Sequence, residues 1–126
     1  QQVLRQVYPT YPDRCDDDLI ASIEYPARDP KAPDVFYKIV TRGANAPTDP
    51  ARSIDVLLKN LKVPLLLCWG ESDPWIVSSI GDRVESLAKS LDVAVTRASI
   101  EAGHCPMDEN PAQVNAALLG WMETSV

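Results

Sequence analysis

Residues 63–75 read VPLLLCWGESDPW, an unbroken apolar run that ends in a glycine and an acidic turn bounded by proline. Such a run has no polar face to turn towards water, so it predicts a β-strand buried on both faces, as in a parallel sheet. Residues 93–99 predict a second short strand because β-branched side chains are frequent in it. The apolar spacing over residues 80–91 predicts a helix between the two. A strand–helix–strand unit of this kind implies a right-handed parallel crossover.

The last predicted helix begins at Asn110-Pro111. Asparagine is a good N-cap, proline suits the first helical position, and Gln113 is placed for a capping box. Asp108 and Glu109, just before this point, are expected to favour the helix N-terminus through the helix dipole.

The first 60 residues predict short helices joined by irregular loops. Three groups of apolar side chains recur at helical spacing: Leu19, Ile20 and Ile23; Val35, Phe36, Ile39 and Val40; Ile54, Leu57, Leu58 and Leu61. The acidic run at residues 16–18 suits the positive end of the first helix. Tyr25-Pro26 is expected to end that helix, and residues 41–50 are expected to form a loop.

The predicted fold class is therefore α/β, with a helical segment over residues 1–60 and a parallel sheet with helices over residues 61–126. Two strands are not a sheet that can stand alone, because the first needs neighbours on both edges and helices on both faces. We expect the sheet to be incomplete in this chain, with the missing strands upstream or in a partner chain.

The chain carries a net charge of −6, from 18 acidic and 12 basic side chains. A negative surface repels phosphate groups, so nucleic acids and anionic membrane surfaces are unfavourable partners. The longest apolar run is far shorter than the roughly 20 residues of a transmembrane helix. One histidine and three scattered cysteines match no metal-ligand spacing, so no metal site is predicted. The cysteines also form no disulfide framework, which favours a reducing compartment.

Two residues stand just beyond the carboxyl ends of the predicted strands, where parallel α/β folds place functional groups. Asp73 follows the first strand, between Gly70 and Pro74, and His104, the single histidine, follows the second beside Gly103. A histidine oriented by a carboxylate is the arrangement of a general base. The alternatives are an Asp-Pro turn that merely ends a strand, and a histidine that is structural or simply exposed.

These two residues lie in segments that resemble a known family. VPLLLCWGESDPWI, followed by GHCPMDENPAQVN and a terminal GW, resembles the C-terminal part of α/β-hydrolases. It looks most like the epoxide-hydrolase and haloalkane-dehalogenase-like branch of plants, algae and cyanobacteria, in whose neighbourhood the chloroplast pheophytinases lie. VLRQVYP and YPARDPKAPDVFYKIV look like cap-domain helices of the same branch. The resemblance implies that residues 1–60 are a helical cap and residues 61–126 the C-terminal part of a hydrolase core.

The resemblance also implies roles for individual residues. Asp73 would be the acid and His104 the base of a nucleophile–His–Asp triad that cleaves esters, hydrophobic or chlorophyll-derived ones among them. No cofactor and no metal would be needed. Trp75 would line the substrate pocket, although core packing accounts for an aromatic residue there equally well. The likeness to pheophytinases implies a chloroplast location; without it, a cytoplasmic one is expected.

The nucleophile of such a triad is missing from these residues. The sequence contains no Gly-x-Ser-x-Gly elbow and no His-Gly oxyanion motif. Cys105 is an unfavourable nucleophile, because adjacent residues in an extended loop point apart and His104 is its neighbour. This chain alone is therefore predicted to be inactive, with a serine or an aspartate supplied by a missing N-terminal half or a partner chain. The competing hypothesis is a truncated, inactive homologue that serves as a structural or binding subunit of a larger assembly.

Overall fold

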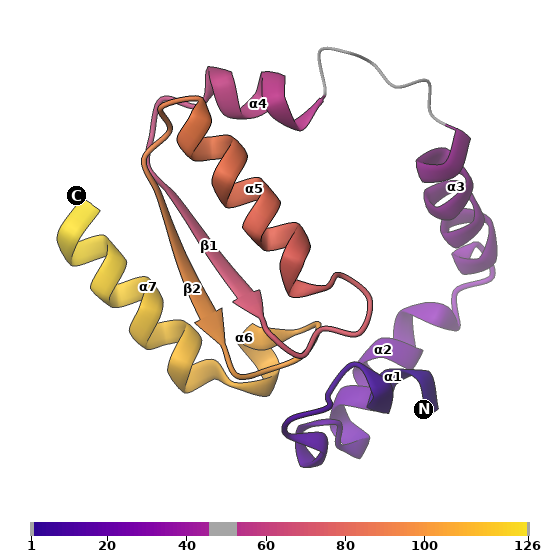
Figure 1. Cartoon of the computed structure of the whole chain (residues 1–126). Helices are drawn as coiled ribbons and strands as arrows, with labels where there is room; N and C mark the ends of the chain where they lie inside the picture. The colour runs from indigo at the N-terminus through magenta and orange to yellow at the C-terminus, as the bar shows by residue number, and fades with distance from the viewer. Residues whose placement is uncertain (1, 46–52, 126) are drawn as a thin grey trace.

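The computed structural model describes residues 2–45 and 53–125 (Figure 1). Helices occupy the first half, and a strand–helix–strand unit followed by two helices makes up the second. In chain order the elements are α1 (Gln2–Gln6), η1 (Pro12–Arg14), α2 (Asp17–Ala27), α3 (Ala32–Asn45), α4 (Ile54–Asn60), β1 (Leu65–Gly70), α5 (Ser78–Ser90), β2 (Val95–Ile100), α6 (Pro106–Glu109) and α7 (Pro111–Ser125). The predicted fold class, a partial α/β fold, is confirmed. None of the helices in the described part of the chain is long and apolar enough to span a bilayer.

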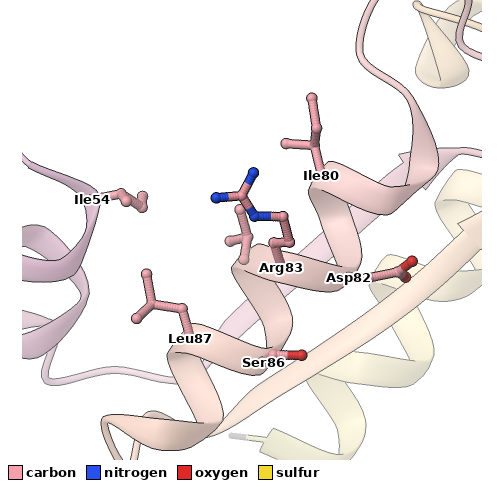
Figure 2. A pocket seen from close by; sticks show the side chains of 7 residues that line it. Ile54, Ile80, Asp82, Arg83, Ser86 and Leu87 are labelled. Carbon is pink, nitrogen blue, oxygen red and sulfur yellow. The ribbon is translucent and has the colours of Figure 1, made fainter.

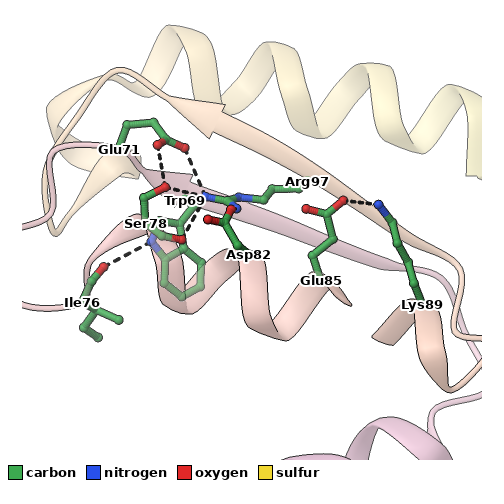
Figure 3. Close-up of polar contacts among 8 residues, drawn as sticks. All are labelled: Trp69, Glu71, Ile76, Ser78, Asp82, Glu85, Lys89 and Arg97. Atoms are coloured by element: carbon green, nitrogen blue, oxygen red, sulfur yellow. Dashed lines mark hydrogen bonds and ion pairs between the residues drawn. The ribbon is translucent and has the colours of Figure 1, made fainter. Parts of the chain in front are cut away.

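The sheet consists of β1 and β2, which run parallel and in register from Leu65 opposite Val95 to Gly70 opposite Ile100. α5 and α7 pack against both strands from opposite faces (Figures 1 and 3). The side chains of residues 65–69 are nevertheless only half-buried, less than the burial on both faces that the apolar run predicts. The reason is that, within the described residues, β1 is paired along one edge only.

One small hydrophobic cluster fixes the start of the sheet. Leu58, Ala88 and Val93 are buried in it, so α4 packs on the end of α5 and on the entry to β2. The chain turns between α5 and β2 at Asp92, whose φ of 56° lies in the left-handed region. The Val93 N–H donates to the Ala88 carbonyl at 3.0 Å, the bond that closes a Schellman-type helix end.

A second cluster lies at the other end of the strands, where the chain beyond β2 meets the N-terminal segment. Val7, Tyr8, Cys15 and Ile20 are buried there, and Cys105 packs against them. This cluster places the first 20 residues beside the loop that carries the single histidine.

The predicted helices of the first half are present, and their ends differ from the predictions at two places. Asp16 caps α2, with its side chain accepting the Leu19 N–H at 2.8 Å, so the acidic start is confirmed. Pro26 does not end this helix; it lies in the last turn, where the Arg28 N–H still reaches the Tyr25 carbonyl. A proline removes one N–H donor and crowds the preceding turn, so α2 continues past Pro26 for only one residue, to Ala27.

The loop predicted over residues 41–50 is wrong for residues 41–45, because α3 continues to Asn45 through Gly43. A glycine lowers helix propensity by about 1 kcal/mol without ending a helix. Residues 46–50 lie outside the described residues.

Asn110 caps α7 as predicted, with its Oδ1 accepting the Gln113 N–H at 3.3 Å. Gln113 does not complete the capping box on the Asn110 backbone. Its Oε1 accepts instead from the Asn110 side chain at 3.0 Å and from the Glu101 N–H at 2.8 Å. The start of α7 is thereby tied to the end of β2.

Candidate active site

Asp73 lies in the turn that follows β1, and its own carboxylate holds that turn. Oδ1 accepts the backbone N–H groups of Trp75 at 2.8 Å and of Ile76 at 3.0 Å, as aspartates do in Asx turns. The side chain is 8% exposed. Because Oδ1 is engaged by the backbone, the direction of Oδ2 is fixed.

A second network brackets the same turn (Figure 3). The Ser78 hydroxyl donates to Glu71 Oε2 at 2.6 Å. Arg97 donates to the Ser78 hydroxyl oxygen at 2.6 Å and to Glu71 Oε1 at 3.3 Å. The Arg97 guanidinium lies over the Trp69 ring, 5.9 Å from its centroid. The hydrogen bond from Ser78 is the main reason that the pKa of Glu71 lies below its ordinary value. Residues 71 and 78 stand at the two ends of the turn, so this network holds it closed around Asp73.

His104 lies in the corresponding turn after β2. Its Nδ1 is 2.9 Å from Asp73 Oδ2, and its side chain is 29% exposed. Its backbone N–H donates to the Val7 carbonyl at 3.1 Å. An imidazole that donates from Nδ1 to a carboxylate carries its lone pair on Nε2. Of the residues within 2–45 and 53–125, none is hydrogen-bonded to that nitrogen. The structure thus brings together the two residues that the sequence singled out.

Two glycines let the turns approach each other. A Cβ on Gly70 would lie 1.9 Å from the Gly103 carbonyl oxygen, and one on Gly103 would lie 2.4 Å from the Val7 carbonyl oxygen. The Ser72 N–H donates to the Ala102 carbonyl at 3.0 Å, which continues the strand pairing into the turns. The separation of Asp73 and His104 is therefore set by backbone contact.

Asp73 is held in its ionised form. Burial by itself would raise the pKa of this carboxyl, but hydrogen bonds from the Ile76 backbone, from His104 and from the Trp75 backbone outweigh it, and the pKa lies below its ordinary value. An ionised carboxylate is the state that accepts the Nδ1 proton of a neutral imidazole.

Stability is expected to depend on pH through Asp73. Its folded-state pKa lies below the unfolded value of about 3.9. The ionised side chain therefore stabilises the fold at every pH above the unfolded pKa, and this contribution is lost as pH falls through the folded pKa. Denaturant unfolding of wild type and Asp73→Asn, at several pH values below neutrality, checks this. The advantage of wild type should persist down to about pH 4 and vanish only below it. An advantage that does not change with pH would contradict the prediction.

Trp75 stands beside the imidazole. The centroids of the two rings are 4.8 Å apart, with the rings tilted by 59°. Trp75 is 56% exposed, so within the described residues it is not packed in a core, and its ring forms a wall next to His104.

Three other nucleophilic side chains near these turns, those of Cys68, Ser78 and Cys105, are engaged elsewhere. Cys105 packs towards Tyr8, whose pKa is raised first by burial and then by its contacts with Asp108 and Cys105. Burial raises the pKa of the Cys68 thiol and keeps it protonated. The Ser78 hydroxyl is bonded to Glu71 and Arg97. Across the described ranges there is no group of three or more side chains that could hold a metal ion.

Glu109 and Asp108 make contacts that the sequence analysis missed. Both were expected to act on the dipole of the last helix. Glu109 is instead 1% exposed and accepts the backbone N–H groups of Thr10 and Tyr11, each at 2.7 Å, and that of Gly103. No local pattern signals these contacts, because Thr10 and Tyr11 lie 99 and 98 residues earlier in the chain.

Comparison with known proteins gives one informative similarity. A segment of 65 residues, 52% of this chain, is 34% identical to the chloroplastic pheophytinase of Arabidopsis thaliana. The segment spans 13% of the length of that protein. No family model matches the chain, and no solved structure matches it. The similarity supports a hydrolase-like relationship at the level of the family, and the observed arrangement of helices around a parallel sheet is consistent with it.

Proposed function

We propose that this chain supplies the acid and the base of an ester-cleaving hydrolase, with Asp73 orienting His104. The observation that carries the proposal is the contact of 2.9 Å between Asp73 Oδ2 and His104 Nδ1. Its support is threefold: both residues lie in the turns that follow parallel strands, the carboxylate is kept ionised, and Nε2 faces no partner within the described residues. The similarity to a pheophytinase adds a hydrolase-like relationship.

The proposed reaction needs a nucleophile that is absent from these residues. A serine supplied by another segment or chain would lose its proton to His104 Nε2 as it attacks the ester carbonyl. The imidazolium would then return this proton to the leaving alkoxide, while the Asp73 carboxylate stabilises the positive ring. An aspartate nucleophile would instead give a dehalogenase or an epoxide hydrolase.

The same proposal gives a role to the two halves of the chain and to Trp75. Residues 1–60 would form a helical cap and residues 61–126 the C-terminal part of the catalytic core. Trp75, half-exposed beside the imidazole, would be a wall of the substrate pocket. We further propose a hydrophobic, chlorophyll-derived ester as substrate and a chloroplast location, on the similarity to the chloroplastic pheophytinase.

The test is intact mass spectrometry of the native protein before and after treatment with a fluorophosphonate, which labels activated serines. We expect a species heavier than the 13.9 kDa of this chain that takes up one label, and that cleaves p-nitrophenyl esters. A heavier species that hydrolyses epoxides or haloalkanes and takes up no label would assign an aspartate nucleophile. A native species of 13.9 kDa without label or turnover would contradict the proposal.

A second candidate function is a structural or binding subunit without activity. The observation that favours it is the amount of apolar surface the described residues expose. α3 presents Val35, Phe36 and Ile39, each more than half exposed. Between α4 and α5 there is a hollow of about 590 Å³ that includes Ile54, Ile80 and Leu87 (Figure 2). This hollow does not include Asp73 or His104. An unlabelled native species of 13.9 kDa that copurifies with a partner would support this function.

A further inference from the structure

Glu109 is the one charged side chain that is fully buried among the described residues, at 1% exposed. Its two oxygens serve different parts of the chain. Oε1 accepts the N–H groups of Thr10 and Tyr11, each at 2.7 Å, and Oε2 accepts that of Gly103. A buried carboxylate is costly unless it is well hydrogen-bonded, and three backbone donors meet that condition. The carboxylate thus joins the N-terminal segment to the residue that precedes His104.

Two further contacts tie the same pieces together. The His104 N–H donates to the Val7 carbonyl at 3.1 Å. The Tyr8 hydroxyl donates to Asp108 Oδ2 at 2.6 Å. Residues 7–11 are therefore bonded to His104 itself and to Asp108 and Glu109, which follow it, and Glu109 accepts two of these four bonds.

Gly103 needs such an anchor. It has no side chain with which to pack, and a Cβ at this position would collide with the Val7 carbonyl oxygen and with Pro9. Its N–H is bonded to Glu109, and this bond holds the loop together with that of the neighbouring His104 N–H to the Val7 carbonyl. Since His104 is the next residue, a shift of Gly103 moves the imidazole relative to Asp73.

We propose that Glu109 is a positioning residue for His104. By binding Gly103 on one oxygen and residues 10 and 11 on the other, it fixes the backbone from which the imidazole projects. It also couples the N-terminal helical segment to the acid–base pair. The inference rests on the proposed function, because positioning matters to turnover only where His104 is the base. A misplacement of about 1 Å costs such a reaction about 10²-fold in rate.

The test compares Glu109→Gln with Glu101→Gln. The first variant keeps the shape of the side chain but turns an amide NH₂ group towards a backbone N–H, and two donors cannot bond to each other. Either the bond to Gly103 or the bonds to Thr10 and Tyr11 must therefore break. The second makes the same change of charge on an exposed side chain of the same loop. Steady-state kinetics of ester cleavage is one readout. The other is the NMR signal of the His104 Nδ1 proton, assigned as the signal that His104→Ala removes.

We expect Glu109→Gln to lower kcat by about 10- to 100-fold with KM unchanged within about two-fold. The Nδ1 proton signal should broaden or vanish, because the ring is no longer held against Asp73. Glu101→Gln should retain both kcat and the signal. A Glu109→Gln protein with the kcat and the ring signal of wild type would overturn the proposal.

Two provisions keep the test decisive. If Glu109→Gln does not fold, hydrogen exchange of the wild-type protein is measured instead. The amides of Thr10, Tyr11, Gly103 and His104 should then be protected from exchange together. If these amides exchange as fast as exposed ones, the proposal is overturned. If the wild-type protein cleaves no ester, the proposed function fails, while the ring signal of the two variants still decides whether Glu109 positions His104.

Discussion

His104→Ala and Asp73→Asn are each expected to lower ester turnover by about 10⁴-fold, the size of loss that follows removal of one member of such a triad. The first removes the group that takes the proton of the nucleophile. The second leaves the imidazole in place but changes which nitrogen carries its proton. Initial rates with a p-nitrophenyl ester measure both losses, and KM should change little because neither side chain is proposed to bind the substrate in its ground state.

The contacts of Asp73 explain why its replacement should spare the fold. Asparagine retains a carbonyl oxygen in place of Oδ1, which can still accept the N–H groups of Trp75 and Ile76. Its NH₂ group, in place of Oδ2, faces Nδ1 of His104 and can only donate to it. The imidazole must then carry its proton on Nε2, where the proposed reaction needs a lone pair.

The matched control is Asp55→Asn, which removes a carboxylate from an exposed position in α4. It should retain the turnover of wild type. Circular dichroism and the unfolding midpoint establish that His104→Ala and Asp73→Asn remain folded. Full activity in either variant would refute the assignment of Asp73 and His104 as the acid and the base.

The sequence predicted the parts of the structure that depend on local pattern. The run at residues 63–69 and the β-branched residues near 95 are recognisable because each strand is encoded by consecutive side chains. Once the strands are parallel, their carboxyl ends lie at one edge, so Asp73 and His104 had to be neighbours. The sequence thus predicted that Asp73 and His104 are neighbours, but it did not predict the distance of 2.9 Å between Oδ2 and Nδ1.

Long-range contacts were not predictable in this way. In the sequence, Glu109 is recognisable only as an acidic residue before a helix. Its contacts with Thr10 and Tyr11 arise when the chain folds. The ends of helices also escaped prediction where two tendencies compete. Pro26 and Gly43 each disfavour a helix, yet the hydrogen bonds of neighbouring residues carry α2 and α3 past them. The contacts that hold His104 therefore depend on the N-terminal segment, which no pattern near residue 104 reveals.

Gly70→Ala is expected to destabilise the protein by about 3 kcal/mol or more, at the upper end of the cost of overpacking. The added Cβ would lie 1.9 Å from the Gly103 carbonyl oxygen and 2.8 Å from that of Ala102. Both are backbone atoms, so no side-chain rotation can relieve the collision, and the two turns must separate. Urea unfolding measures the change in free energy. Gly120→Ala is the control, since a Cβ there meets nothing within 4 Å.

The two glycine variants should move stability in opposite directions. Gly120 lies within α7, where alanine is favoured over glycine by about 1 kcal/mol, so Gly120→Ala should be the more stable protein. Gly70→Ala should also lose turnover in the fraction that stays folded, because separation of the turns pulls His104 Nδ1 away from Asp73 Oδ2. A Gly70→Ala protein as stable as wild type would mean that the turns do not touch, and that backbone contact does not set the distance between the acid and the base.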